Sequence, residues 1–488
     1  MDTQAPFRVR FTDAILTTLD LVETARRTPI HFMGIGGAGM APLAELVLRS
    51  GGRVTGCDAI PSAAAERLAA AGVEVVTGHA PGHVDGCAAL IVTSAVPPDH
   101  PEIVAARQQG IPVLKRAQAL GSIVNRGTVV GIAGTHGKTT TTALTTAALA
   151  AIGLDPTGLV GGRVPAWGGN LRPGSSRYFV VEADEFDRSF LTLRPRIAVV
   201  TTLEADHLDI YGSLAAVYEA FHEFVDAVPD DGLVVACADD HGVGRLLART
   251  AGPRERVLSY GSRAGAMLRI ENVRLEGSAA RFDLRLRGTR LGAVQLQVPG
   301  MHNIRNATAA AAVAHHRGGQ WKAIAEGLAS YSGVDRRFEH IGEVNGIRVV
   351  DDYAHHPTEI VATLRAARAG YPESRVVAVF QPHLFSRTRD FSEEFGRAMA
   401  LADLAFVTDI YPARETPIPG VTGELVAEAA WRGGAPVGYL PLRGEVARAV
   451  AEALRPGDLC LTLGAGDLNG AAREIVSLLT TASSASVR

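Results

Sequence analysis

Lysine is scarce in this chain of 488 residues. It occurs at Lys115, Lys138 and Lys322, so nearly all of the 48 basic residues are arginine, and chemistry that needs an amine side chain has few candidates. An excess of positive charge is also missing, because 51 acidic residues leave a formal net charge of −3 at pH 7. Nucleic acid and anionic membrane surfaces require a basic footprint, so we expect neither as a partner.

Paired cysteines and long apolar segments are missing as well. The four cysteines, Cys57, Cys87, Cys237 and Cys460, form no CxxC pair. This spacing fits neither a zinc site nor a disulfide framework, and it favours a reducing compartment. The N-terminus carries no apolar core of a signal peptide, and the longest uncharged stretch, residues 139–154, is rich in threonine. We therefore expect a cytoplasmic protein with no membrane insertion.

The length predicts several domains, because a single hydrophobic core stops growing near about 250–300 residues. Short apolar runs alternate with alanine-rich helical stretches, at residues 30–33, 54–57, 90–93, 129–133, 178–181, 197–201, 376–380 and 404–408. Such runs predict parallel strands covered on both faces, so the predicted fold class is α/β. We predict a Rossmann-like domain at 1–126, a central P-loop ATPase-like domain at 127–331 and a second Rossmann-like domain at 332–488.

Two further patterns refine this division. Residues 254–297 alternate between apolar and polar side chains, which predicts an antiparallel addition at the edge of the central domain. An alanine-rich helix is expected at 302–318, and the turn-rich segment 331–337 predicts a hinge into the last domain.

The first phosphate-binding signature is GIGGAG at residues 34–39, between the strand at 30–33 and a predicted helix at 41–49. Its glycines let the backbone approach a diphosphate at a helix N-terminus, and Asp58 closes the next strand, where an acid can bond a ribose hydroxyl. The pattern specifies a diphosphate more firmly than a nicotinamide. NAD(P), another nucleotide diphosphate and a purely structural glycine turn all remain open.

The second signature is VVGIAGTHGKTT at residues 129–140, a strand that runs into GxxGK[ST] and then a helix. It departs from the strict P-loop pattern at Ile132, where a glycine is expected. The working parts are kept: loop amides for phosphate oxygens, the Lys138 ammonium for the transferred phosphate, and the Thr139 hydroxyl for Mg²⁺. One of only three lysines stands at the required place, so ATP or GTP binding is predicted.

Charged clusters end two further predicted strands, EADE at 182–185 and EADH at 204–207. Parallel strands deliver their carboxyl ends to the sheet edge that also holds the phosphate loop, so these groups can converge on a nucleotide-bound metal. Carboxylates suit Mg²⁺, whereas chemistry alone favours a water-mediated role for His207. Solvated strand-end charges are the alternative.

Other candidates lie further along the chain. Asn303 and Asn306 share a helix face, although N-capping would also explain them. Arg336 and Arg337 lie at the hinge, where a guanidinium could reach a transferring phosphate. Loops follow strands at 351–357 and 381–389; the adjacent histidines of the first have no third ligand at suitable spacing, so small-ligand binding is favoured there over a metal.

This constellation resembles the Mur ligase family. The motifs that carry the resemblance are, in order, HFMGIGGAGM at 31–40, GTHGKTT at 134–140, EADE at 182–185, EADHLD at 204–209, HNIRN at 302–306, DDYAHHPTE at 351–359 and SRTRDF at 386–391. The resemblance implies an ADP-forming amide synthesis with ATP and Mg²⁺. In it, the lactyl carboxylate of UDP-N-acetylmuramate is phosphorylated, and the acyl phosphate is captured by the amine of L-alanine.

The resemblance also implies site residues, position by position. Those for ATP are Gly134, Thr135, His136, Gly137, Lys138, Thr139, Thr140, Asn303, Asn306, Arg337 and Asp352. Those for the UDP-sugar are Gly34, Gly36, Gly37, Gly39, Met40, Asp58 and Ser94. Those for the amino acid are Tyr353, His355 and Arg387. The metal ligands would be Thr139, Glu182 and His207, and the catalytic residues Lys138, His207 and Arg337.

Two departures from the family pattern bear on the site. No lysine lies between Lys138 and Lys322, so the carbamylated lysine that other Mur ligases can carry is ruled out. Some relatives carry an arginine at the position of Leu384, which leaves the alanine carboxylate more dependent on Arg387.

Three other functions remain open. They are a family member that ligates a preformed tripeptide, a nicotinamide oxidoreductase, and a non-catalytic nucleotide switch. The expected partners are small molecules, and we expect a monomer or weak homodimer.

Overall fold

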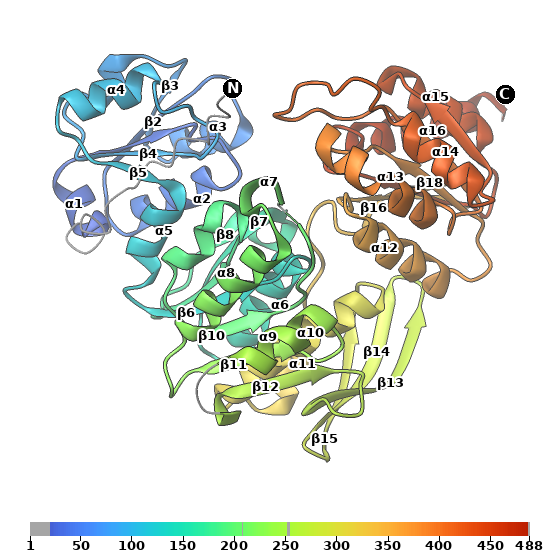
Figure 1. The fold of residues 1–488 in the computed structure, drawn as a ribbon, viewed down its shortest axis with the longest axis horizontal. Coiled ribbons are helices and arrows are strands. Elements are labelled where there is room, and N and C mark those ends of the chain that lie inside the picture. Colours follow the sequence, from blue (N-terminus) through green and yellow to red (C-terminus); the bar gives the residue numbers. More distant parts are fainter. Residues whose placement is uncertain (1–19, 207, 251–253, 487–488) are drawn as a thin grey trace.

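The computed structural model describes residues 20–206, 208–250 and 254–486. Three sheets follow one another along the chain, and helices flank each of them (Figure 1). The predicted α/β fold class is confirmed. Each of the eight apolar runs forms a strand with a parallel neighbour, because residues buried on both faces of a sheet must be apolar at every position.

The first sheet has five parallel strands in the order β3-β2-β1-β4-β5. The strands are β1 (Ile30–Met33), β2 (Val54–Asp58), β3 (Glu74–Thr77), β4 (Ala89–Val92) and β5 (Val113–Lys115). The helices are α1 (Leu21–Arg27), α2 (Met40–Arg49), α3 (Ala63–Ala70), η1 (Pro81–Val84), α4 (Pro101–Gln108) and α5 (Arg116–Val124). Every residue of β1 and β4 is buried, as a central parallel strand requires.

The central sheet has ten strands in the order β15-β14-β13-β12-β11-β10-β6-β9-β7-β8. The strands are β6 (Thr128–Ala133), β7 (Thr157–Val164), β8 (Gly169–Arg172), β9 (Tyr178–Glu182), β10 (Pro195–Val200), β11 (Leu233–Cys237), β12 (Val257–Gly261), β13 (Leu268–Glu276), β14 (Ala279–Leu286) and β15 (Thr289–Leu296). The last three form the antiparallel addition predicted at the edge, while β12 pairs in parallel with β11.

Helices cover both faces of this sheet. They are α6 (Lys138–Ala151), η2 (Pro165–Trp167), η3 (Phe186–Thr192), α7 (Leu208–Tyr211), α8 (Leu214–Asp226), α9 (His241–Arg249), η4 (Arg254–Arg256), α10 (Met301–His316) and α11 (Trp321–Ala329). Alternate residues of β6 enter two different apolar clusters: Val129 on one face, Val130 and Ile132 on the other. The cluster that holds Val129 continues into the first domain through α5, so these two parts share one core.

The third sheet has the order β16-β17-β21-β18-β19-β20. Its strands are β16 (Glu339–Val344), β17 (Ile347–Asp352), β18 (Val376–Phe380), β19 (Leu404–Thr408), β20 (Val437–Leu440) and β21 (Leu459–Leu463). Its helices are α12 (Pro357–Gly370), α13 (Phe385–Met399), α14 (Glu424–Arg432), α15 (Arg443–Ala453) and α16 (Asn469–Ser486). Only β16 runs antiparallel to its neighbour.

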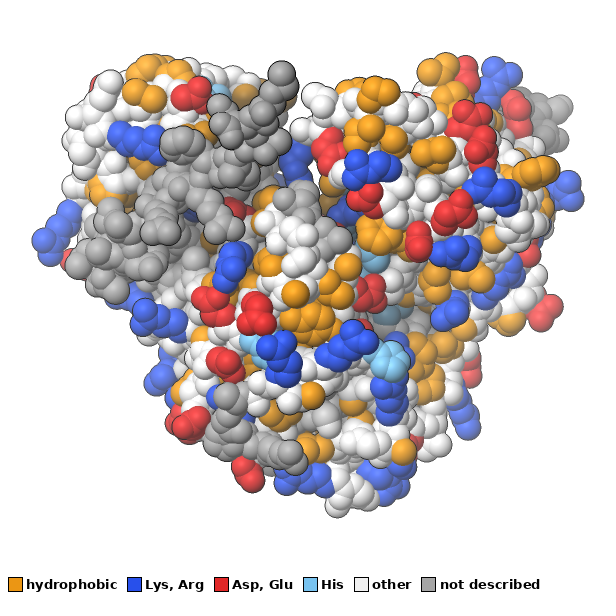
Figure 2. Space-filling model, viewed as in Figure 1, with side chains coloured by type: hydrophobic (Ala, Val, Ile, Leu, Met, Phe, Trp, Pro, Cys, Tyr) orange, Lys and Arg blue, Asp and Glu red, His pale blue; other side chains and the backbone are white. Residues whose placement is uncertain are grey.

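The first and third sheets lie at the top of Figure 1, above opposite sides of the central sheet. Both predicted domain boundaries fall in loops, between α5 and β6 and between α11 and β16. Charged side chains of both signs are interspersed over the face shown in Figure 2, in line with the near-neutral charge balance. Within the described ranges, no helix has the length and apolar character needed to cross a membrane.

Candidate active site

The loop between β6 and α6 has a backbone that only glycine adopts without strain. Gly134 and Gly137 have φ of +133° and +81°. A Cβ on Gly134 would lie 2.1 Å from Oγ1 of Thr201, and one on Gly137 would lie 2.6 Å from Oδ1 of Asn306. The loop therefore passes closely under its neighbours and delivers Lys138 to the first position of α6, where helix amides favour an anion.

Lys138 is held at the centre of the loop. Its ammonium donates hydrogen bonds to the carbonyl oxygens of Gly134 (2.8 Å) and Thr135 (3.2 Å) and to Oε1 of Glu185 (2.9 Å). Burial by itself lowers the pKa of Lys138, but the carboxylates of Glu185, Asp184 and Glu182 together outweigh burial, so the net shift is upward. Burial raises the pKa of Glu185 to about 7, against the opposing effect of the ammonium. The buried lysine thus stays charged, as a phosphate ligand requires.

Thr139 and Glu182 form a second pair beside the lysine. The Thr139 hydroxyl donates to Oε1 of Glu182 (2.9 Å), and the amide of Gly161 donates to Oε2 (2.6 Å). A hydroxyl and a carboxylate at the end of a P-loop suit a hard divalent cation, so these residues fit Mg²⁺. His207, the third predicted ligand, lies outside the described residues.

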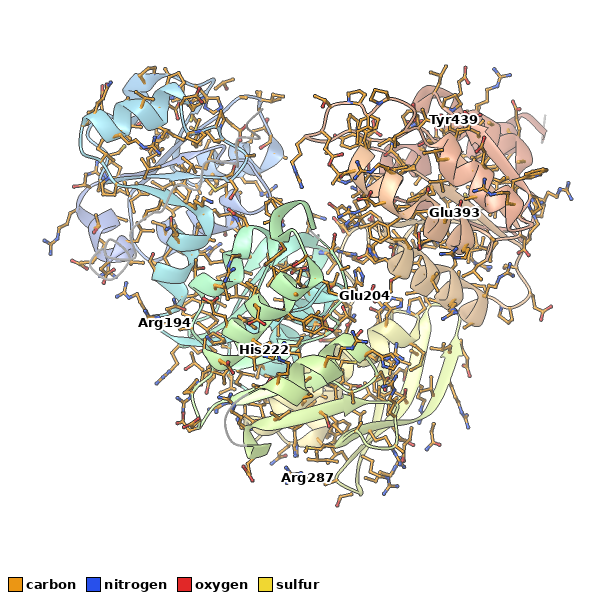
Figure 3. The ribbon with its side chains drawn as sticks, viewed as in Figure 1. Arg194, Glu204, His222, Arg287, Glu393 and Tyr439 are labelled. Carbon is orange, nitrogen blue, oxygen red and sulfur yellow. The ribbon has the colours of Figure 1, made fainter. Side chains whose placement is uncertain are left out.

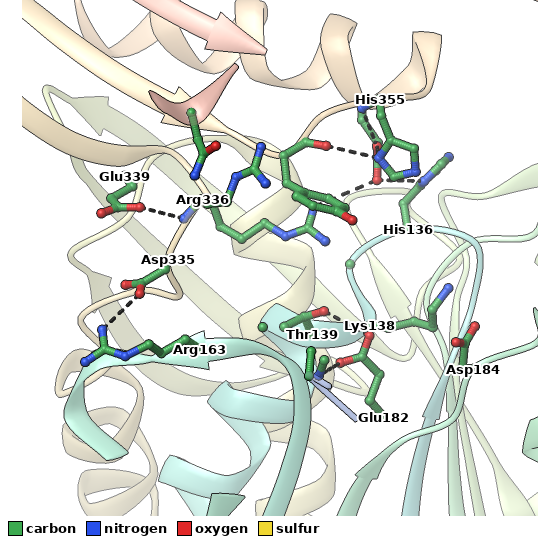
Figure 4. Close-up of a pocket in the computed structure, with 18 of the residues that line it drawn as sticks. His136, Lys138, Thr139, Arg163, Glu182, Asp184, Asp335, Arg336, Glu339 and His355 are labelled. Carbon is green, nitrogen blue, oxygen red and sulfur yellow. Dashed lines mark hydrogen bonds and ion pairs between the residues drawn. The ribbon is translucent and has the colours of Figure 1, made fainter. Parts of the chain in front are cut away.

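These groups lie at a cavity of about 570 Å³, which is lined by residues of all three domains. Its walls include Ala38 from the first glycine loop, Lys138 and Thr139, and Arg337, Tyr353 and His355 from the hinge and the third domain, among others. Figure 4 shows Lys138, Thr139 and Glu182 on one side, with His136, Arg336 and His355 on the other. The structure therefore brings to one cavity the predicted residues Lys138, Thr139, Glu182, Arg337, Tyr353 and His355. Arg387, which is also predicted for the amino acid, is not part of its lining.

His136 joins the phosphate loop to the third domain. Its Nδ1 lies 3.2 Å from Oε1 of Glu359, and its Nε2 lies 3.6 Å from Oε2 of Glu204. Burial by itself lowers the pKa of His136, but the two carboxylates outweigh burial and raise it to about 9. Glu204 lies where the central and third domains face each other (Figure 3), and it accepts a hydrogen bond from Thr358 (2.7 Å). Polar contacts therefore hold this interface.

A smaller cavity of about 170 Å³ adjoins the first. Thr140, Asn303, Asn306, Arg337 and Asp352 all line it. The alternative that the two asparagines are N-caps is wrong, because Gly300 caps α10 and both asparagines lie inside the helix. Nδ2 of Asn303 donates to the carbonyl of Pro299, and Nδ2 of Asn306 donates to Oδ1 of Asn303. This side-chain network walls a space beside the phosphate loop.

The two predicted hinge arginines both lie over the Tyr353 ring, with Cζ 4.9 Å (Arg336) and 5.1 Å (Arg337) from its centroid, and both line the larger cavity. Arg336 donates to Oδ2 of Asp351 (3.2 Å) and to the carbonyl of Gly464 (2.6 Å), whereas Arg337 also lines the smaller cavity. Burial by itself lowers the pKa of Arg337, but Glu359 and other nearby carboxylates outweigh burial and raise it. Arg337 thus lines both cavities together with residues of the phosphate loop.

Asp352 is held within the third domain beside this guanidinium. It accepts hydrogen bonds from the amides of Phe338 and Ala354, and burial raises its pKa to about 6.

The first glycine loop is braced from within. The amide of Gly36 donates a hydrogen bond to Oδ2 of Asp58 (2.8 Å), so this carboxylate holds the loop in place. Met40 is buried at the start of α2. The Ser94 hydroxyl donates to Oδ2 of Asp187 (2.8 Å), a residue of the central domain. The assignment of Gly34, Gly36, Gly37, Gly39 and these side chains to a UDP-sugar remains a prediction.

Arg387 makes an ion pair that the sequence did not suggest. Its guanidinium lies 3.0 Å from Oδ1 of Asp206, and both side chains are largely buried. Nδ1 of His355 lies 3.0 Å from the carbonyl oxygen of Tyr353. Leu384 is buried at φ +72°, at the N-cap position of α13.

Sequence reasoning missed several residues at this site. Glu359 and His302 line the smaller cavity, and burial lowers the pKa of His302 to about 4, so its imidazole stays neutral. Glu185 and Glu204 lie in the charged clusters that were singled out, but only the structure shows their partners. Glu359 ends the DDYAHHPTE motif and completes the capping box of α12, so a signal was present, but it was not singled out as a site residue.

A phosphate-binding loop at a cavity shared by three α/β parts defines a three-domain, nucleotide-dependent enzyme. Three family models cover most of the chain: the Mur ligase family catalytic domain at 29–128, the Mur ligase middle domain at 132–314, and the Mur ligase glutamate ligase domain at 336–466. A UDP-N-acetylmuramate--L-alanine ligase from Salinibacter ruber is 46% identical over 92% of this chain and 94% of its own. The chain therefore belongs to the Mur ligase family, whose members are ATP-using enzymes.

Solved structures agree with this assignment. A UDP-N-acetylmuramate-alanine ligase from Thermotoga maritima superimposes with a TM-score of 0.79 at 28% identity, covering 93% of this chain and 100% of that one. A murein peptide ligase from Psychrobacter arcticus has a TM-score of 0.68 at 26% identity, covering 93% and 98%. The three-domain layout is thus shared with both.

Proposed function

We propose that this protein is an ATP-dependent, ADP-forming ligase that joins L-alanine to the lactyl carboxylate of UDP-N-acetylmuramate in peptidoglycan precursor synthesis. One observation carries the proposal: Lys138 and Thr139 of the ATP loop, Ala38 of the first glycine loop, and Tyr353 and His355 of the third domain line a single cavity. The curated relative at 46% identity carries the corresponding name.

The chemistry follows from the charges at the cavity. A carboxylate is a poor acylating agent until it is phosphorylated, and phosphoryl transfer between two anions accumulates negative charge. Lys138 and Arg337, both held charged by nearby carboxylates, are placed to neutralise that charge. Thr139 and Glu182 would hold Mg²⁺, which would neutralise phosphate oxygens when bound.

The amine end of the reaction belongs to the third domain. Tyr353 and His355 line the cavity, and Arg387 reaches its edge through Asp206. We assign these three residues to L-alanine, with Arg387 replacing the arginine that is missing at Leu384. All four cysteines are unpaired, which supports a cytoplasmic location.

The test is amine specificity. The enzyme is given ATP, Mg²⁺ and UDP-N-acetylmuramate with either L-alanine or the L-alanyl-D-glutamyl-diaminopimelate tripeptide, and ADP release is measured. We expect turnover with L-alanine. Efficient ADP release with the tripeptide alone would instead assign the protein to tripeptide recycling, and hydride transfer to a nicotinamide would refute both.

A further inference from the structure

A second cluster of ligand-type side chains lies in the first domain, apart from the cavity described above. It comprises His31, Cys57, His83 and Glu102, each of which offers a ligand atom within 4.8 Å of the others. We refer to these four residues as the first-domain cluster. No part of the proposed reaction uses them.

The fold explains how four distant positions meet. Register pairs His31 with Thr55 and Met33 with Cys57, and the period of two along a strand places His31 and Cys57 on the same face of the sheet. That face is covered by η1, which carries His83, and by α4, which packs on η1 and carries Glu102 in its first turn. The cluster is therefore built by tertiary packing.

The spacing of the ligand atoms is close to that of a tetrahedral zinc site. Nε2 of His31 lies 3.3 Å from Sγ of Cys57, and this Sγ lies 3.4 Å from Oε1 of Glu102. Nδ1 of His83 lies 2.9 Å from the same Oε1. Zn–S and Zn–N bonds of about 2.3 and 2.0–2.1 Å place neighbouring ligands about 3.3–3.6 Å apart. These three distances lie within about 0.5 Å of that spacing, and every other pair of ligand atoms lies within 4.8 Å.

Burial and charge also favour a cation here. Cys57 and Glu102 are completely buried. Among the ion pairs of the described residues, those of Glu102 are with His79 and His83, and none involves lysine or arginine. An isolated buried carboxylate is costly. A divalent ion bound by one thiolate, one carboxylate and two neutral imidazoles makes a site with no net charge.

The surroundings support the ligands as they do in metal sites. Nδ1 of His31 lies 2.9 Å from Oγ1 of Thr55, which orients the ring so that Nε2 faces Cys57. The amide of Ala80 donates to Oε1 of Glu102 (2.9 Å). The partly exposed His79, whose Nδ1 lies 3.2 Å from Sγ of Cys57, gives the cluster a polar route to solvent.

We propose that the first-domain cluster binds one Zn²⁺ ion. Sulfur and imidazole ligands select zinc over Mg²⁺, and binding forms a metal–sulfur bond while the thiol proton leaves to solvent. The carbonyl oxygen of Cys57 accepts hydrogen bonds from the amides of Gly34 (2.8 Å) and Ile35 (3.0 Å). The ion therefore stabilises the start of the first glycine loop, at Gly34 and Ile35.

The test uses the full chain, stripped with a chelator under reducing conditions and titrated with Co²⁺ without oxygen. We expect one equivalent to produce a sulfur-to-cobalt charge-transfer band, which Zn²⁺ then removes. Neither the Thr139 and Glu182 pair nor the set of His136, Glu204 and His356 contains sulfur, so binding there gives no such band.

Two variants and a control complete the experiment. Cys57→Ser should abolish the band, while Cys87→Ser, a thiol of the same domain outside the cluster, should retain it. His83→Asn, at a partly exposed position, should weaken zinc affinity at least about 10–100-fold and lose the rise in Tm that zinc gives the parent protein. No band in the folded parent, or an equal band in folded Cys57→Ser, overturns the proposal. Neither result touches the ligase assignment, which rests on other residues.

Discussion

The sharpest prediction concerns the pair formed by Lys138 and Glu185. In Lys138→Met the apolar volume stays similar, but the carboxylate of Glu185, whose side chain is 3% exposed, loses the ammonium that lies 2.8 Å away. Removing one partner of a buried ion pair costs about 3–5 kcal/mol of unfolding free energy. The pKa of Glu185, already raised to about 7, should rise further, so the loss should be larger at pH 8 than at pH 6, where the carboxyl takes up a proton.

Activity separates the structural and catalytic roles of the lysine. We expect kcat of Lys138→Met to fall about 10²–10³-fold, because the ammonium acts on charge that develops during phosphoryl transfer. The double variant Lys138→Met/Glu185→Gln removes both charges and should recover most of the stability, as measured by urea unfolding, without recovering ADP release. If the double variant regains kcat, or if the single variant raises only KM, the catalytic role of Lys138 is refuted.

Three further predictions concern the same site. The pKa of His136 in the folded protein is about 9, above its ordinary value of about 6.5. Its ion pairs therefore contribute about 3 kcal/mol of unfolding free energy below pH 6.5, and this contribution is lost as the pH rises through 9. Urea unfolding across this range should show an unfolding free energy that falls with pH, and His136→Gln should abolish that dependence. Gly137→Ala should cost more unfolding free energy than Gly153→Ala. Both glycines have φ near +80°, but only a Cβ at position 137 would meet a neighbouring atom, Oδ1 of Asn306 at 2.6 Å. Equal losses of stability in thermal unfolding would show that φ alone matters. Arg337→Ala should lower kcat about 10²-fold or more in the ADP-release assay, whereas a change confined to the KM for ATP would argue for binding alone.

Much of the fold could be read from local pattern. The apolar runs form parallel strands, because a strand that is buried on both faces needs apolar side chains at every position. The phosphate loop could also be predicted from the sequence, because its glycines at positive φ and the lysine that begins the next helix are close together in the chain. Glu359 ends the DDYAHHPTE motif, but its contact with His136 could not be found in this way, because that contact joins two domains and positions 223 residues apart.

The first-domain cluster shows the same limit. The absence of a CxxC pair led the sequence analysis to expect no zinc site, but cysteine spacing says nothing about a site assembled from β1, β2, η1 and α4, such as the one proposed above.

The sequence by itself determined the fold class, the two glycine loops and the family, because these depend on short-range order and on motifs that recur in the same succession. The tertiary structure alone decided which charges pair. It paired Lys138 with Glu185, placed Arg337 but not Arg336 in the lining of the smaller cavity beside the phosphate loop, and joined Arg387 to Asp206. Pairing depends on distances of a few ångströms between residues far apart in the chain, and only packing sets those distances.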